Sequence, residues 1–171
     1  LADPLMHILR NAIDHGLEDP EVRKKASKPE VGVITMAAFQ KGNHVVIEIA
    51  DDGRGLDIER IQKIALKKGL VQKDFLQDMT HRDIMNLLFL PGFSTRDSVS
   101  EISGRGVGLD VVKTNIGNLS GMIDVTSEPG KGTKFTITLP ITLAIIRALI
   151  IRVNERIYGI PLNISARTVF L

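Results

Sequence analysis

The chain lacks cysteine and tryptophan, and only 4% of its 171 residues are aromatic. Without cysteine it has neither disulfides nor thiolates that could bind a metal or act as nucleophiles. With so few aromatic residues, we expect a core of Ile, Leu and Val. We also expect no stacking surface of the kind that binds single-stranded nucleic acid.

Neither sign of charge dominates, because 22 Lys and Arg stand against 20 Asp and Glu, a net charge of +2. The pI near 9.0 depends on two surplus positive charges, so it is weak evidence for binding to DNA or a membrane. No apolar run reaches the roughly 18 residues of a membrane span, since the longest, around Leu143 to Ile151, is interrupted by Arg147. We expect no nucleic-acid partner, no direct membrane insertion and a cytoplasmic location.

The rest of the composition is that of a globular protein, with 43% hydrophobic and 25% charged residues. The length predicts about one domain and a piece of a second. We place the boundary at Pro140, with a first domain over residues 1–140 and an incomplete second domain over residues 141–171. Because the chain begins with Leu, almost directly at a helix, we interpret it as part of a longer protein.

The first predicted helix is amphipathic, and its polar face carries residues that can bind ligands. Asp3 and Pro4 predict its start and Gly16 its end. Opposite an apolar stripe, one face carries polar residues at helical spacing: His7, Asn11 and His15, with Arg10 and Asp14 beside them. Taken singly, His7 is most simply a structural histidine and Asn11 a surface residue. Together on one face, they favour a face that lines a site, where an amide oxygen can bind a hard cation such as Mg²⁺.

Hydrophobic periodicity and turn residues place the other elements of residues 1–140. A short helix after Asp19 carries the basic run Arg23, Lys24 and Lys25, which we interpret as a solvated face. Further helices are expected over residues 58–68, capped by Asp57, over 83–89, with a capping box from Thr80, and up to 119. Strands are expected over residues 31–39, 45–49, 122–127 and 133–139, and again over 143–153 and 156–162.

The segment Asp51-Asp52-Gly53-Arg54-Gly55 places a carboxylate at the end of a strand, followed by two glycines. Such a carboxylate can accept hydrogen bonds from an exocyclic amine, and the glycines let the backbone approach a flat ring. Alone, the pattern is a weak signal and is more simply a plain turn with an Asp cap.

A second cluster, Gly104-Arg105-Gly106-Val107-Gly108, precedes a helix. Three glycines leave backbone N–H groups free to point at phosphate, and the start of a helix favours anions. The segment follows the polar loop 93–103 and its sixth residue is Leu109, so it is not a dinucleotide-binding fingerprint. The simpler alternative is a flexible hinge.

Five motifs, taken in order, resemble a known family. They are H-x-x-R-N-x-x-D-H-G (7–16), D-D-G-R-G (51–55), F-L-P-G-F-S-T (89–95), G-R-G-V-G-L-D (104–110) and G-K-G-T (130–133). This order resembles the N box, G boxes and F box of the Bergerat-fold (GHKL) ATPases. The residues within each motif resemble those of the chemotaxis histidine kinases of the CheA type. The tail 139–161 resembles the start of that family's CheW-like regulatory domain.

The resemblance implies an α+β fold, in which a two-layer sandwich packs helices on one face of a mixed sheet, with ATP held between the layers. The first strands of an SH3-like β-barrel would follow.

The resemblance also implies a Mg²⁺–ATP site. Asn11 and His7 would be its catalytic and metal-associated residues, with Asn11 on the ion and His7 orienting the γ-phosphate or a metal-bound water. Asp51 would accept the adenine amine. The other implied ATP contacts are Arg10, Asp14, His15, Gly53, Gly55, Arg60, Ser94, Thr95, Gly104, Arg105, Gly106, Val107, Gly108 and Thr133.

His7 separates two activities within this superfamily. The gyrase-type and chaperone ATPases resemble one another in placing a water-activating Glu four residues before the metal-binding Asn. With His there, the chain resembles a protein histidine kinase of a two-component phosphorelay, whose acceptor histidine lies on a separate phosphotransfer domain. The alternatives are an ATP-hydrolysing conformational motor and a module that only binds nucleotide.

The implied partners follow from the same resemblance. They are the phosphotransfer domain, a CheW-like adaptor with chemoreceptors in a cytoplasmic receptor array, downstream response regulators, and a second copy of the protein held through a dimerisation domain outside this sequence.

Overall fold

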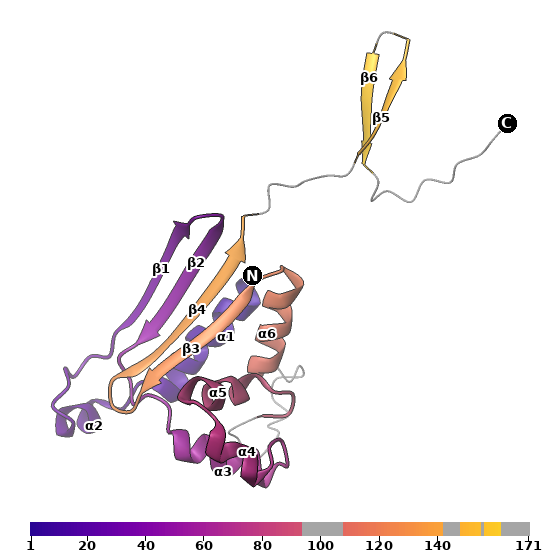
Figure 1. Cartoon of the computed structure of the whole chain (residues 1–171). Helices are drawn as coiled ribbons and strands as arrows, with labels where there is room; N and C mark the ends of the chain where they lie inside the picture. Colours follow the sequence, from indigo (N-terminus) through magenta and orange to yellow (C-terminus); the bar gives the residue numbers. More distant parts are fainter. Residues whose placement is uncertain (94–107, 142–147, 155, 162–171) are drawn as a thin grey trace, which may run out of the picture. The chain divides into compact units, whose positions relative to one another are not determined.

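The computed structural model describes residues 1–93, 108–141, 148–154 and 156–161 (Figure 1). Its contacts divide the chain into two compact units, Leu1–Pro140 and Ile141–Leu171. The first unit is a four-stranded sheet with helices packed on one face (Figure 1). The predicted α+β sandwich is confirmed for this unit.

The sheet consists of β1 (Ile34–Lys41), β2 (His44–Asp51), β3 (Met122–Glu128) and β4 (Gly132–Pro140), in the spatial order β1-β2-β4-β3. All three pairings are antiparallel. The expected mixed sheet is therefore corrected to an antiparallel one for the described strands. β1 and β2 form one hairpin, and β3 and β4 form the other. The two hairpins are joined by the pairing of β2 with β4, which is also antiparallel.

The helical layer has more elements than the sequence predicted. The helices of the first unit are α1 (Ala2–Asn11), a π-helical extension (Ala12–Gly16), α2 (Pro20–Lys25), α3 (Ile58–Lys67), α4 (Lys73–Asp78), α5 (His81–Asn86), a 3₁₀ turn (Leu87–Phe89) and α6 (Leu109–Asn118), of which α2 lies beyond the end of the strands (Figure 1). α4 was not predicted, because six residues are too few to show a helical period and, unlike α5, this helix has no capping side chain.

The helix boundaries test the predicted capping residues. Asp57 caps α3 by accepting a hydrogen bond from the Arg60 N–H at 3.0 Å, and Thr80 forms the predicted capping box with Asp83. The prediction for Asp3 is wrong, because α1 already begins at Ala2 and has no side-chain cap.

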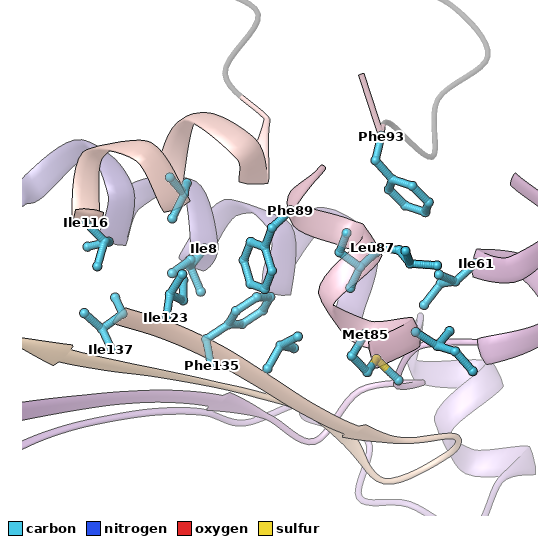
Figure 2. Packing of buried hydrophobic residues seen from close by; sticks show 14 of the residues in the cluster. Ile8, Ile61, Met85, Leu87, Phe89, Phe93, Ile116, Ile123, Phe135 and Ile137 are labelled. Atoms are coloured by element: carbon cyan, nitrogen blue, oxygen red, sulfur yellow. The ribbon is translucent and has the colours of Figure 1, made fainter. Parts of the chain in front are cut away.

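The core lies between the sheet and the helices. In Figure 2, Ile8 of α1 and Ile116 of α6 face Ile123 and Ile137 of the sheet. Ile8, Ile116 and Ile137 have no exposed surface, and Phe135 packs in the same cluster. Fully burying such a side chain contributes roughly 1.5–3 kcal/mol. The core is mainly aliphatic, as the composition predicted.

The second unit contains an antiparallel hairpin of β5 (Ala148–Val153) and β6 (Arg156–Pro161). Asn154 at the turn has φ 54°, a left-handed conformation that Asn adopts more readily than most residues. The SH3-like barrel stays a prediction, because the described part of this unit contains one hairpin. Within the described residues, no helix has the length and apolar character needed to cross a membrane.

Candidate functional site

The polar face of α1 lies toward the start of α6. His7 and Asn11 on this face are half-buried. Burial lowers the pKa of His7, as does the positive charge of Arg10, while the negative charge of Asp110 acts in the opposite direction. The His7 imidazole is therefore mainly neutral at pH 7. Because Asp110 lies in the first turn of α6, its influence on His7 connects the α1 face with the end of the second glycine cluster.

Gly108 ends that glycine cluster and is the N-cap of α6. Its backbone is extended, and no side chain caps the helix. The helix dipole favours negative charge at this end. This part of the predicted phosphate segment is thus a helix N-terminus, whereas Gly104, Arg105, Gly106 and Val107 lie outside the described residues.

Asp51 is the last residue of β2, an interior strand of the sheet, and it is half-buried. Its Oδ1 accepts a hydrogen bond from the Gly53 N–H at 2.9 Å. Burial raises the pKa of Asp51, and hydrogen bonds from the backbone N–H groups of Gly53 and Thr133 oppose that rise. Desolvated but still able to accept hydrogen bonds, this carboxylate suits a neutral donor such as an amine.

The turn after Asp51 packs tightly against the end of the α1 extension. The Arg54 N–H donates to the carbonyl of Gly16 at 2.9 Å. A Cβ on Gly53 would collide with that same carbonyl, and the Asp51 Cγ lies 3.2 Å from where a Cβ on Gly16 would be. A Cβ on Gly132 would likewise collide with the Asp51 carbonyl. Glycine is required at Gly53 and Gly132, where a Cβ would collide with backbone, whereas a Cβ on Gly16 would press only on the Asp51 side chain.

Thr133 lies opposite Asp51 in the β2–β4 register. Its hydroxyl is buried and lies 3.1 Å from the Ser127 hydroxyl, which itself donates to the Gly132 carbonyl and accepts from the Leu56 N–H. This hydrogen-bond network connects β3, β4 and the segment that leads into α3. It lies next to the end of β2, where Asp51 is paired with Thr133.

The structure brings some of the predicted site residues together and leaves others apart. His7 and Asn11 share a helix with Arg10, Asp14 and His15, whose side chains are exposed. The extension of that helix reaches Asp51 and Gly53 through Gly16. Gly55, with φ 71°, packs against the carbonyl of Glu128. Two further predicted contacts, Ser94 and Thr95, lie outside the described residues.

Arg60 is exposed in the first turn of α3. Within the described part of the chain, its side chain donates no hydrogen bond to the other site residues. Its predicted role as a phosphate contact therefore stays a prediction.

One prediction near the site is wrong. Arg23 was expected on a solvated face, but it is 1% exposed, while Lys24 and Lys25 are exposed. Its guanidinium lies 2.7 Å from a carboxylate oxygen of Asp52 and 3.2 Å from one of Glu18. The sequence offered one sign of this burial, because Arg23 is the only arginine in the basic run. A guanidinium suits a buried site with several acceptors better than an ammonium does.

We call Glu18, Arg23, Lys28 and Asp52 the charged corner. Lys28 completes it, with its Nζ 2.8 Å from the other carboxylate oxygen of Glu18. Burial would raise the pKa of both acids, but hydrogen bonds and charge from the two cations hold the pKa of Glu18 and of Asp52 below their usual values.

The donor set of the α1 face fits magnesium with nucleotide. Within the described residues, no group of three or more His, Cys, Asp and Glu could enclose a metal ion. Mg²⁺ typically takes one or two protein oxygens and fills its remaining positions with phosphate and water. The Asn11 amide oxygen on the half-buried face suits this arrangement.

Comparison with known proteins identifies the class. Residues 1–143 match the family described as histidine kinase-, DNA gyrase B-, and HSP90-like ATPase. The chain belongs to this family, which accounts for the two-layer fold and indicates ATP as its nucleotide.

Curated relatives narrow the comparison within the class. The chain is 51% identical to the chemotaxis protein CheA of Treponema pallidum over 95% of this chain and 20% of that protein. It is 49% identical to the sensor histidine kinase CheAY of Helicobacter pylori, over 99% and 21%. It is 46% identical to CheA of Bacillus subtilis, over 95% and 24%. The resemblance to CheA-type kinases is confirmed, and the chain spans about a fifth to a quarter of these relatives' length.

Proposed function

We propose that this chain is the ATP-binding catalytic domain of a chemotaxis histidine kinase. It transfers the γ-phosphate of ATP to a histidine on a separate phosphotransfer domain. The observation that carries the proposal is the course of α1 and its extension. α1 packs against α6, whose first turn holds Asp110, and the last residue of the extension, Gly16, abuts Asp51. In this proposal, α1 and its extension run from the phosphate end of the site to its adenine end.

Each end has a chemical role in the proposal. Asp51 accepts a hydrogen bond from the adenine amine, and Gly53 and Gly55 let the backbone approach the flat ring. Asn11 offers its amide oxygen to Mg²⁺, which when bound neutralises triphosphate charge. Arg10, Asp14 and His15 extend the same face, and the glycines before α6 bind phosphate through their N–H groups.

The transfer step requires no activated water. The acceptor imidazole nitrogen forms a bond to the γ-phosphorus while the bond to the ADP oxygen breaks, and the imidazole proton is lost to solvent. Positioning supplies most of the rate in such a reaction. His7, half-buried and mainly neutral, orients the γ-phosphate in this proposal and does not serve to activate water.

The regulatory partners rest on the relatives' names and on the tail. In this proposal, residues 141–171 begin a CheW-like domain that couples the kinase, through an adaptor, to chemoreceptors in a cytoplasmic array. The kinase acts as a homodimer and passes phosphate to response regulators. Adaptor binding should be lost on deletion of residues 141–171, and unchanged binding would refute this coupling role.

The activity is tested with γ-labelled ATP, with and without an isolated phosphotransfer domain. Label on that domain, lost in Asn11→Ala and reduced in His7→Ala, is the expected result. Free phosphate alone would support the hydrolase instead. Retained ATP binding with neither product would support a binding module. Asn118→Ala, at the far end of α6, is the matched control and should leave transfer unchanged.

A further inference from the structure

We infer that the charged corner is a positioning device for base selection, which holds the Asp51 carboxylate where it distinguishes a 6-aminopurine from a 6-oxopurine. The inference deepens the proposed function and rests on Asp51 being the adenine acceptor. It assigns Arg23 and Lys28 a role in nucleotide specificity without contact with the nucleotide.

A single peptide unit, the one that joins Asp52 to Gly53, connects the two cations of the corner to the Asp51 carboxylate. Its carbonyl oxygen accepts hydrogen bonds from Lys28 Nζ at 2.9 Å and from Arg23 at 3.3 Å. Its N–H donates to Asp51 Oδ1 at 2.9 Å. Because a peptide unit is planar and rigid, fixing its carbonyl also fixes the direction of its N–H. The two cations therefore orient one of the two backbone donors to Asp51, the other being the Thr133 N–H.

The residues on both sides of this peptide are held by the same cations. Lys28 Nζ also donates to the Gly53 carbonyl at 2.7 Å. The Asp52 side chain binds Arg23 through one oxygen, at 2.7 Å, and accepts from the Val33 N–H through the other, at 2.9 Å. Asp51 and Asp52 thus have separate tasks. Asp52 anchors the turn, and Asp51 keeps acceptor capacity beyond its bond to Gly53.

The corner is itself held in place. Glu18, whose side chain is 6% exposed, binds both cations. Arg23 also donates to the carbonyl of Pro29 at 2.8 Å, which ties down the loop after α2. Two acids balance two bases, and no buried side-chain nitrogen or oxygen among the described residues lacks a hydrogen-bond partner. A fully satisfied network of this kind is rigid and specific in geometry.

The consequence is a preference that can be measured. A carboxylate held in this orientation accepts from the amine of ATP and opposes the carbonyl oxygen of inosine triphosphate. When the peptide unit is released, the carboxylate can turn, so ATP loses its favoured contact and inosine triphosphate loses its penalty. The ratio of the two affinities should therefore fall, whereas a general loss of structure would lower both affinities alike.

The test uses Lys28→Met in the full chain, because Lys28 is 15% exposed and its removal leaves Arg23 paired. Binding of ATP and inosine triphosphate is measured by calorimetry, with urea unfolding to verify the fold. We expect an ATP affinity about 10-fold lower and an ATP preference at least about 5-fold smaller, the scale of one charged hydrogen bond. Lys28→Arg, which keeps a cation at the carbonyls, should restore most of the preference.

Lys134→Met is the matched control. Lys134 pairs with Glu48 at 3.5 Å in the same sheet, next to Thr133, on the face away from the core. It should leave both affinities unchanged. Equal losses for the two nucleotides in Lys28→Met, or an unchanged preference, would overturn the inference. If Asp51→Asn also leaves ATP binding intact, the proposed function fails as well, so the two failures are distinguishable.

Discussion

Two regions of the first unit, the aliphatic core and the charged corner, are buried from water but are held together by different interactions. Around Ile8 and Ile116, aliphatic side chains with no exposed surface pack without any polar partner. In the charged corner, Arg23 is just as buried but makes five hydrogen bonds to fixed acceptors. Apolar burial is non-directional and tolerates swaps of similar volume. The corner depends on direction, so it can transmit geometry to Asp51, and the core can only supply stability.

The largest expected effect is in the core. Ile116→Ala should lower the free energy of unfolding by about 3 kcal/mol, from lost burial and the cavity it leaves. Urea unfolding measures the change, with Leu119→Ala as control, since Leu119 is exposed and directly follows the same helix. The ATP preference over inosine triphosphate should not change. A changed preference would mean that the core, too, controls the geometry of the site.

The second effect concerns binding rather than stability. Asp51→Asn should weaken ATP binding by about 30-fold, the scale of a lost hydrogen bond to a charged acceptor, because an amide presents one acceptor oxygen instead of two. Calorimetric titration measures it, and Asp74→Asn, on the surface of α4, is the control. Equal affinity of Asp51→Asn and the unmodified chain would remove Asp51 from the site.

A third effect distinguishes the two regions by pH. Burial would raise the pKa of Glu18 and Asp52, but their cation partners lower it below the ordinary values of 4.5 and 3.8. The unfolded chain then binds more protons, so these groups stabilise the fold above those values, and that contribution is lost as pH falls through the lowered pKa. Asp51, with a raised pKa, acts in the opposite sense: its contribution is lost as pH rises.

Lys28→Met should therefore make the rise in stability between pH 3 and pH 5 shallower, because Glu18 loses its main partner. Urea unfolding across that range measures the slope. Ile116→Ala is the control, since it should lower the curve without changing its slope. An unaltered slope in Lys28→Met would show that the corner does not depend on its ion pairs.

The smallest expected effect on stability comes from an exposed ion pair, which we compare with a buried one. Arg82 lies 2.8 Å from Asp124, about the distance of Arg23 from Asp52, but the Arg82 side chain is 72% exposed and that of Arg23 is 1% exposed. Exposed pairs contribute little because water and salt screen them. Arg82→Met should leave the unfolding midpoint unchanged, whereas Arg23→Met should lower it. Equal shifts would contradict the role assigned to burial.

Local patterns predicted much of the fold. Periodicity located α1, α3, α5 and α6 and all four strands of the sheet, and the caps at Asp57 and Thr80 are confirmed. The ends of elements were less predictable. Residues 31–33 have the composition of a strand, but Val33 hydrogen-bonds to Asp52 instead, and β1 begins at Ile34. The antiparallel order of the strands also depends on contacts between distant segments.

For the site, the residue order alone was enough to identify the family, to nominate Asn11 and Asp51 as ligands and to single out His7, because each motif is local and keeps its chemistry wherever it lies. Only the tertiary structure shows that Gly16 packs against Asp51 and that Arg23 is buried against Asp52. The physical reason is distance along the chain. Glu18, Arg23, Lys28 and Asp52 acquire their partners when the end of β2 meets the loop around α2, and no short sequence pattern encodes that meeting.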